Sequence, residues 1–317
     1  KTMNRRSFLM SSVALGALAA ATPAAFAQSE LTILGSVPNL GFPFFVHMLN
    51  QIKVEAEAQG VNIIESDGQN SAPKQTADIE AALVQVVDAI VISPLDVNAL
   101  APAIEQAIQA NVPVVTVDRR DDGVEGILAH VGADNVKGGE AEAQAVVDAF
   151  PDGAKLFHLQ GQPGAGPAID RNQGVHNVLD PLGDKYQIVF EQTANFARAE
   201  GLSVTEAGLA ANGKPDAIIC ANDDMALGAM EACAARGFTD VKIYGFDALP
   251  EALAAVRDGG LAGTVEQFPG EQSRTAVRIA VAFAKDGTQP EDPLVLLTPI
   301  VISQDNLDQG ERIGEAG

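Results

Sequence analysis

Five side chains with strong hydrogen-bonding groups stand at the ends of short apolar runs. They are Asp118 and Arg119 after residues 114–117, Asn222 after 217–220, Asp247 after 242–246 and Gln267 after 263–265. Carboxylates accept hydrogen bonds, a guanidinium group donates several and an amide does both, so the set suits a ligand with many hydroxyl groups. Phe246 adds an aromatic ring, which covers the apolar C–H face of a sugar well. One such residue alone would be a helix cap or a turn residue; five such residues at four strand ends together predict a site for a sugar or polyol.

The apolar runs alternate with Ala-rich amphipathic segments from Leu31 onward. Strands are expected at residues 31–37, 61–65, 89–93, 114–117, 128–131, 155–159, 187–191, 217–220, 242–246 and 263–265, and helices at 44–59, 76–87, 98–109, 136–149, 225–235 and 271–285. Strict alternation with strands that are nearly continuous apolar runs predicts an α/β fold of parallel sheets covered by helices on both faces. The number of strands fits either two sheets or a single barrel. Ligands of such sheets lie at the carboxyl ends of the strands, where the five side chains stand.

A boundary between two lobes is expected at residues 132–135, where a strand gives way to Asp134 and Asn135. The chain has no Ser/Gly-rich linker, so short crossovers should join the lobes. After Gln267 only one long helix and the run 294–297 remain, which is too little for a third domain. This segment is expected to return and complete the first lobe.

The charge of the chain limits its partners. Lys and Arg number 20 against 42 Asp and Glu, a formal net charge of −22. So acidic a surface repels phosphate backbones and anionic lipids, which argues against nucleic acid or a membrane surface as partner. The mature chain, at about 290 residues, is long enough for two hydrophobic cores.

The first 27 residues have the order of an export signal. Arg5 and Arg6 precede Ser7-Phe8-Leu9, a modest apolar stretch covers 13–21, and Ala25-Phe26-Ala27 supplies small residues for a signal peptidase. The apolar stretch is far short of the roughly 20 residues of a membrane span. We therefore predict a twin-arginine export signal at 1–27 and a mature chain that begins at Gln28.

Other site chemistries find no support in the sequence. Residues 208–214 have phosphate-loop spacing, but Pro215 replaces the required Ser or Thr, and residues 161–166 lack the third glycine of a dinucleotide fingerprint at Ile169. No Gly-x-Ser-x-Gly motif occurs, and the four histidines lack the spacing of a zinc helix. Adjacent acidic pairs, 121–122 and 223–224, cannot flank a glycosidic bond from two sides. No catalytic residue, metal ion or cofactor is expected.

The two cysteines are expected to be buried, unpaired thiols. Cys220 closes a strand, and Cys233 lies inside the following helix, about 15 Å from the start of that helix. That separation is beyond the reach of a disulfide.

Several motifs in order along the chain resemble the ribose-binding protein group of periplasmic solute-binding proteins. They are Phe42-Pro43-Phe44-Phe45, Asp118-Arg119, Asp134-Asn135, residues 159–171, residues 222–228, Gly245-Phe246-Asp247 and Gln267. The resemblance spans residues 31 to about 306. It implies a type I periplasmic binding protein with two Rossmann-like lobes joined by three hinge crossovers: residues 31–132 plus 268–295 in the first lobe and 133–267 plus 296–312 in the second. It further implies a periplasmic, monomeric substrate-binding component of a sugar ABC importer, whose partner is a permease in the inner membrane.

The resemblance also implies roles for individual residues. Phe44 and Phe45 from the first lobe and Phe196 from the second would sandwich the sugar ring, and Phe246 would pack beside Asp247. Asp118 and Arg119 would bind hydroxyl groups from the first lobe. Arg171, Asn222 and Asp247 would bind them from the second lobe, and Gln267 from the hinge.

One departure from the group bears on the ligand. Phe42 stands where the group has Asn, and the loop 36–41 is about two residues longer, so that Ser36 or Asn39 could replace the missing amide. The departure disfavours ribose and leaves another pentose, a short polyol or a deoxy sugar as ligand. A chemotaxis or signalling receptor is compatible with the same features. A sugar-processing enzyme would need a catalytic cluster, and a sugar-responsive repressor would need a helix-turn-helix segment; the sequence contains neither.

Overall fold

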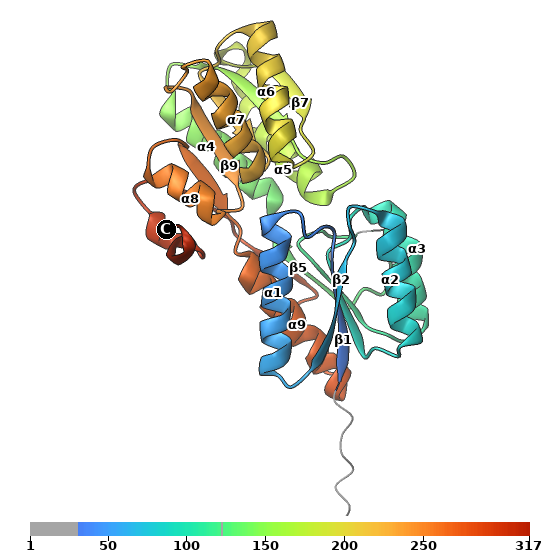
Figure 1. Cartoon of the computed structure of the whole chain (residues 1–317). Helices are drawn as coiled ribbons and strands as arrows, with labels where there is room; N and C mark the ends of the chain where they lie inside the picture. Colours follow the sequence, from blue (N-terminus) through green and yellow to red (C-terminus); the bar gives the residue numbers. More distant parts are fainter. Residues whose placement is uncertain (1–30, 122) are drawn as a thin grey trace, which may run out of the picture.

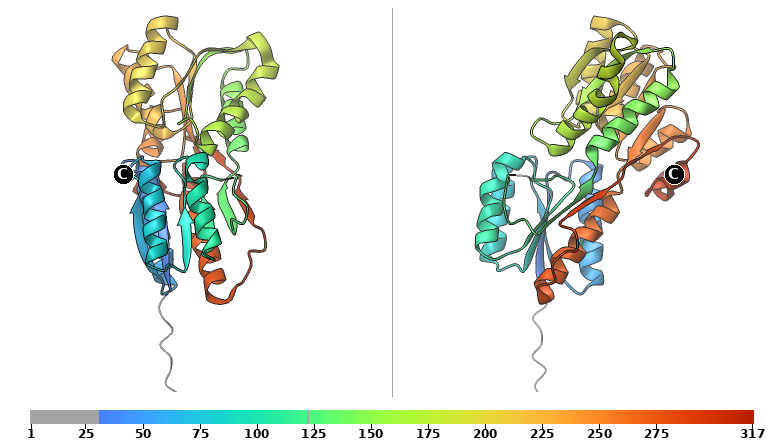
Figure 2. Two further views of the ribbon diagram at one scale, coloured as in Figure 1. Left: turned by 90° about the vertical axis from the view of Figure 1, so that its right-hand side faces the viewer. Right: turned by 180° about the vertical axis from the view of Figure 1, so that it is seen from behind.

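The protein is described by a computed structural model that covers residues 31–121 and 123–317, so the predicted export signal lies outside the described residues. Figure 1 shows two lobes, each built on one six-stranded sheet. The alternative of a single barrel is therefore wrong. The other two views show that only a few crossing segments join the lobes (Figure 2).

The first lobe contains a fully parallel sheet in the order β11-β5-β4-β3-β1-β2. Its strands are β1 (Thr32–Val37), β2 (Asn62–Asp67), β3 (Ala89–Ile92), β4 (Val114–Val117), β5 (Ala129–Ala133) and β11 (Leu294–Leu297). Helices α1 (Pro43–Ala58) and α9 (Pro269–Asp286) pack together on one face, and α2 (Ala72–Val84) and α3 (Val97–Gln109) on the other (Figure 1). The central strands β3 and β4 are buried at every residue, as their sequences predict, which are apolar except for Thr116.

The second lobe repeats this plan with the strand order β12-β10-β9-β8-β6-β7. Its strands are β6 (Ala154–Gln160), β7 (Tyr186–Thr193), β8 (Ala217–Cys220), β9 (Lys242–Phe246), β10 (Gly263–Glu266) and β12 (Ile300–Ile302). Its helices are α4 (Asn135–Ala149), α5 (Gly166–Leu179), α6 (Arg198–Asn212), α7 (Asp223–Ala235) and α8 (Pro250–Arg257). Short 3-10 turns cover Asp180–Lys185, Leu307–Gln309 and Ile313–Glu315.

The edge strand β12 differs from the expected all-parallel arrangement, because it runs antiparallel to β10. The chain enters β12 directly from β11 without an intervening helix, so it cannot reverse its direction before it joins the second sheet. The sequence did not predict this strand, since three residues are too few to show a periodic pattern of apolar residues.

Three crossovers link the sheets: β5 to α4, β10 to α9, and β11 to β12. The lobe boundary expected after residue 295 falls inside β11, whose residues Leu294–Leu297 all pair with β5 of the first sheet. The boundary expected after residue 132 falls one residue before the end of β5.

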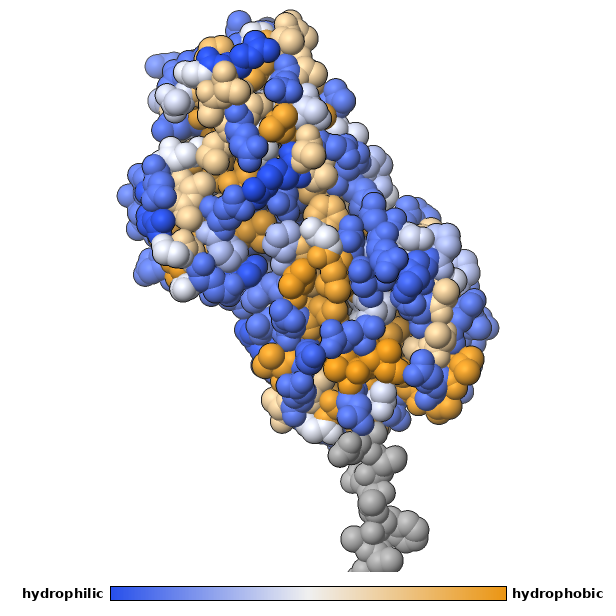
Figure 3. All heavy atoms as spheres, in the orientation of Figure 1, coloured by the Kyte–Doolittle hydropathy of each residue, from blue (hydrophilic) through white to orange (hydrophobic). Residues whose placement is uncertain are grey.

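Glycines allow the close packing of α4 against α5. A side chain at Gly139 would collide with the backbone oxygen of Arg171, and one at Gly174 with the backbone oxygen of Val136. The close contact fixes Arg171 on α5 next to the beginning of α4. On the face of the molecule that Figure 3 shows, hydrophilic residues cover much of the surface, and apolar residues gather on the first lobe.

Candidate functional site

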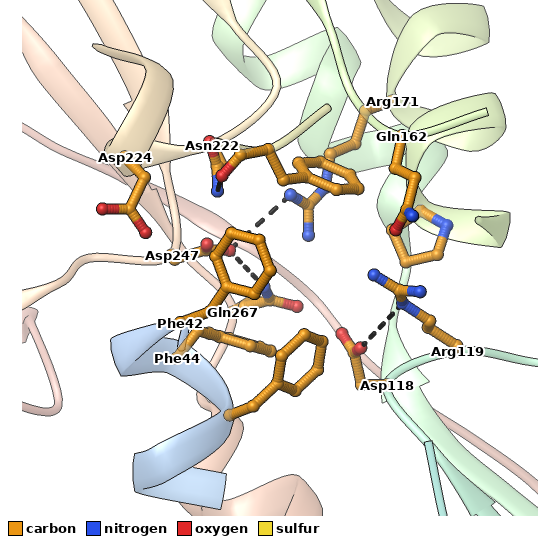
Figure 4. Close-up of a pocket in the computed structure, with 13 residues that line it drawn as sticks. Phe42, Phe44, Asp118, Arg119, Gln162, Arg171, Asn222, Asp224, Asp247 and Gln267 are labelled. Carbon is orange, nitrogen blue, oxygen red and sulfur yellow. Dashed lines mark hydrogen bonds and ion pairs between the residues drawn. The ribbon is translucent and has the colours of Figure 1, made fainter. Parts of the chain in front are cut away.

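A pocket lies between the lobes, where strands of both sheets end (Figure 4). Ten predicted site residues line it: Phe42, Phe44, Phe45, Asp118, Arg119, Arg171, Phe196, Asn222, Asp247 and Gln267. Three further residues, Gln162, Pro167 and Asp224, complete the wall. Most residues of the wall were therefore predicted from the sequence, and both lobes contribute residues to it.

Asp118 and Arg119 form the first-lobe wall. The Asp118 carboxylate accepts a hydrogen bond from Ser93 Oγ at 3.2 Å, and its Oδ2 lies 3.9 Å from Arg119 Nε. Arg119 donates from Nη1 to the backbone oxygen of Leu95 at 2.6 Å. Burial raises the pKa of Asp118, while the guanidinium groups of Arg119 and Arg171 lower it. Burial lowers the pKa of Arg119 to about 10, so this side chain remains charged at neutral pH.

Arg171 holds a central place in the second-lobe wall. Its Nε donates to Asn135 Oδ1 at 2.9 Å and its Nη1 to the backbone oxygen of Ala221 at 2.6 Å. The same Nη1 lies 3.6 Å from Asp247 Oδ1. Figure 4 shows the guanidinium groups of Arg171 and Arg119 reaching into the cavity from two sides. Although Arg171 is only 3% exposed, it therefore borders the space a ligand would fill.

Asp247 and Gln267 meet at the hinge side of the pocket. Gln267 Nε2 donates to Asp247 Oδ1 at 2.6 Å, and Gln272 Nε2 holds the backbone oxygen of Gln267 at 2.7 Å. Burial raises the pKa of Asp247 to about 8, against the opposing effect of Arg171. A ligand hydroxyl group that donates to this carboxylate would favour its charged form.

Asn222 is both a helix cap and a pocket residue. Its Oδ1 accepts from the backbone N–H of Met225 at 3.0 Å, which caps α7, and its Nδ2 donates to the backbone oxygen of Phe196 at 3.1 Å. An amide oxygen has a second lone pair and an amide nitrogen a second proton. The capping role therefore leaves hydrogen-bonding capacity for a ligand.

Aromatic rings cover the faces of the cavity. Phe42, Phe44 and Phe45 lie at the start of α1, where Pro43 at the first helical position sets the turn. Phe45 packs edge-on against Phe44 and Phe42, with ring centroids 5.3 and 6.3 Å apart. Phe196 lines the pocket from the second lobe. The arrangement leaves apolar faces and a polar perimeter.

Three wall residues have left-handed backbones, which are uncommon outside glycine. The φ angles are 62° for Asp118, 60° for Phe196 and 110° for Asp247. Each turns the chain sharply at the end of a strand or just beyond one. Such conformations concentrate where surrounding structure holds a functional side chain in place.

Three predicted residues do not lie in the wall. Ser36 is fully buried at the end of β1, where its Oγ contacts Ser66 Oγ at 3.1 Å and accepts from Gln75 Nε2 at 3.0 Å. Asn39 is half-buried, and its Oδ1 accepts from the backbone N–H of Gly41 at 2.8 Å, which closes the loop on itself. Phe246 is fully buried behind Arg171. Neither Ser36 nor Asn39 therefore stands in for the amide that Phe42 replaces.

The wall also contains residues that sequence reasoning did not assign to it. Gln162 belongs to the Gly-rich turn 161–166, which the sequence analysis considered only as a dinucleotide fingerprint. Asp224 lies in the first turn of α7; it borders the pocket, and its Oδ1 lies 3.7 Å from Arg198 Nε. Pro167 lies at the start of α5, and nothing in the sequence around it indicates a pocket residue.

The expectation for the cysteines is confirmed: Cys220 and Cys233 are buried and unpaired. No helix within residues 31–121 and 123–317 combines the length and apolarity needed to cross a bilayer.

Comparison with known proteins assigns the family. A model of the periplasmic binding protein domain matches residues 33–289. This chain belongs to the periplasmic binding protein family. The ribose import binding protein RbsB of Bacillus subtilis (strain 168) is 42% identical over 244 residues, which cover 76% of this chain and 78% of the relative. Its counterpart in Escherichia coli (strain K12) is 34% identical over 278 residues, or 88% of this chain and 92% of the relative.

Among solved structures, a Caulobacter myo-inositol binding protein bound to myo-inositol superposes with a TM-score of 0.86. It is 42% identical, and the match covers 91% of this chain and 98% of that one. Membership of the family confirms the predicted fold class, two α/β lobes of the type I kind, and the predicted function class, solute binding for import.

Proposed function

We propose that this chain is the substrate-binding component of an ABC importer and captures one uncharged, hydroxyl-rich ring. The observation that carries the proposal is the charge balance of the wall. Asp118 and Asp247 face Arg119 and Arg171, so two carboxylates balance two guanidinium groups once a ligand hydroxyl group holds Asp247, whose pKa is about 8, in its charged form. Asp224 lies 3.7 Å from Arg198, which also pairs with Glu251 outside the wall. A site without surplus charge favours a neutral ligand over a sugar acid or sugar phosphate.

The distribution of polar and apolar groups further favours a ring that carries hydroxyl groups around its whole perimeter. Phe rings from both lobes cover the faces of the pocket, and charged or amide groups stand around the rim (Figure 4). Because the Caulobacter relative holds myo-inositol, we infer a cyclic polyol of the inositol type as ligand. Ribose is the second candidate, because the Bacillus subtilis relative is a ribose import binding protein of equal identity.

Calorimetric titration of the purified protein tests this proposal. We expect myo-inositol to bind more tightly than ribose or xylitol, and glucuronate to give no heat. Tighter binding of the sugar acid, or no heat with any neutral ligand, would overturn it. Ligand recovered unchanged after long incubation is expected of a binding protein, whereas turnover would assign an enzyme.

We also propose a periplasmic location reached by the twin-arginine route, with an inner-membrane permease as partner. The support is the family and the order of Arg5-Arg6, the apolar stretch and Ala25-Phe26-Ala27. Replacing both arginines with lysine should leave the precursor in the cytoplasm. Normal export of that variant would contradict the route without affecting the ligand proposal.

A further inference from the structure

Two histidines and a glutamate meet in the second lobe, and none of the three lines the pocket. His158 on β6 and Glu191 on β7 are direct neighbours in the parallel ladder, and His176 on α5 reaches the same place. Glu191 Oε1 lies 2.9 Å from His158 Nδ1 and 2.8 Å from His176 Nε2. The three atoms all lie within 4.8 Å of one another.

We propose that His158, His176 and Glu191 form a binding site for a divalent cation of the zinc class. Imidazole nitrogen and carboxylate oxygen are ligands that Zn²⁺ accepts, and two histidines with one glutamate form a known three-ligand set with a fourth position open. In a tetrahedral site with bonds of about 2.0–2.2 Å, ligand atoms stand ~3.3 Å apart. The two nitrogen-to-oxygen spacings of 2.9 and 2.8 Å need to lengthen by only about half an ångström to admit the ion, and the two nitrogens lie within 4.8 Å of each other.

Neighbouring residues already orient the ligands. His176 Nδ1 lies 2.9 Å from Asp180 Oδ1, which leaves Nε2 directed at the cluster. A carboxylate behind a metal-bound imidazole is a recurrent feature of such sites. Gln160 Nε2 donates to Glu191 Oε1 at 2.9 Å and to Asn172 Oδ1 at 2.7 Å, which fixes the carboxylate. The three ligand side chains therefore need little ordering on binding.

Exposure supports access from solvent. The His158 side chain is 1% exposed and so is held rigidly by the lobe, whereas those of His176 and Glu191 are 29% and 33% exposed. An ion can therefore arrive from the outer face and meet one fixed and two adjustable ligands. In the present arrangement each imidazole ring donates a hydrogen bond to Glu191. A bound cation would displace the two protons of these hydrogen bonds.

The position of the site suggests a structural role. β7 is the edge strand of its sheet, and α5 packs over that sheet (Figure 1). A cation bound to β6, β7 and α5 would join the edge strand, its neighbour and the covering helix. Because a ligand that binds only the folded state stabilises it, the ion should raise the melting temperature. This proposal does not depend on the identity of the sugar.

The test uses the untagged mature protein after treatment with EDTA and removal of the chelator. We expect calorimetry to show one Zn²⁺ per chain, and Tm to rise by ~5 °C at a free Zn²⁺ concentration 100-fold above Kd. Co²⁺ should give the visible absorption of a tetrahedral site, and Mg²⁺ should have no effect on Tm. Failure of Zn²⁺ to bind the wild-type protein would overturn the proposal.

Variants distinguish Zn²⁺ binding at this site from nonspecific cation binding to an acidic protein. His176→Gln and Glu191→Gln should abolish the Zn²⁺ response, and Asp180→Asn should weaken affinity by about 10-fold or more. His47→Gln is the matched control, because His47 Nε2 lies 3.9 Å from Glu311 but has no place in the cluster. Sugar binding measured in each variant reports that it is folded. An undiminished Zn²⁺ response in folded His176→Gln and Glu191→Gln would also refute the site.

Discussion

The guanidinium carbon of Arg171 lies 3.5 Å from the ring centroid of Phe246. Phe246 is fully buried and does not line the pocket, yet it supports the side chain that reaches the ligand space. The contact combines cation–π attraction with a flat surface that limits the rotation of Arg171.

We expect Phe246→Leu to weaken ligand binding about 10-fold, since it removes this support without touching the ligand. Calorimetry with the native ligand measures the effect. Phe157→Leu is the matched control, because Phe157 is also fully buried in the second lobe and packs on Phe190 outside the pocket wall. Both variants should lose about 1–3 kcal/mol of stability, and only the first should lose affinity. Equal affinities in the two variants would contradict the supporting role.

Phe42 should set which hydroxyl pattern the rim accepts. Phe42→Asn introduces an amide that can bond a ligand hydroxyl group and removes part of the apolar cover. The ratio of ribose to myo-inositol affinity should therefore rise about 5-fold, as one new hydrogen bond is worth roughly 1 kcal/mol. Phe42→Leu is the control, because it retains an apolar side chain and should retain the preference. If Phe42→Asn leaves the order of ligands unchanged in calorimetry, selectivity lies elsewhere in the wall.

Ligand binding should draw the lobes together, because Asp118 belongs to the first lobe and Arg171 to the second. Asp118→Ala or Arg171→Ala should each cost about 2–4 kcal/mol of binding, since each leaves ligand hydroxyl groups without charge-assisted bonds. Small-angle scattering should show a smaller radius of gyration with saturating ligand than without. Tight binding with an unchanged radius would count against closure, as would full affinity in both alanine variants.

Glu142 should lower the stability of the protein at neutral pH. It is 1% exposed, and neither carboxyl oxygen forms a well-aligned hydrogen bond within the described part of the chain, although the nearby backbone N–H of Cys220 favours the charged form. Burial raises its pKa well above the ordinary value of 4.5. The folded state favours the protonated form of this carboxyl group. Its contribution to the free energy of unfolding is therefore fully present below about pH 4.5 and is lost as the pH rises through the raised pKa.

Glu142→Met should therefore raise the free energy of unfolding at pH 7 by about 1–3 kcal/mol, the cost of an unsatisfied buried polar group. The gain should shrink toward pH 4, where the wild-type carboxyl group is protonated in both states. Denaturant unfolding at several pH values measures the difference. Glu206→Met, an exposed substitution on α6, provides the control and should show little change at any pH. A gain independent of pH would assign the effect to packing alone.

The sequence by itself determined the repeating α/β plan and most of the pocket wall. Residues 217–220 are all apolar, and 114–117 are apolar except for Thr116, which is typical of strands buried on both faces. Asp118 directly follows the first run and Asn222 lies two residues after the second, and the carboxyl ends of parallel strands meet at one edge. Their convergence in a pocket therefore followed from local sequence and the geometry of the fold.

Tertiary structure decided what depends on contacts between distant segments. Nothing in the sequence near Phe246 shows that its ring lies against Arg171 instead of a sugar. Likewise, nothing near Ser36 shows that its hydroxyl group forms a hydrogen bond with Gln75. The spacing of His158, His176 and Glu191 matches no metal motif, because strand pairing and the packing of α5 bring them together. Sequence patterns report the local period of each element, whereas these relationships arise only when separate elements pack and a side chain is fixed by its neighbours in space.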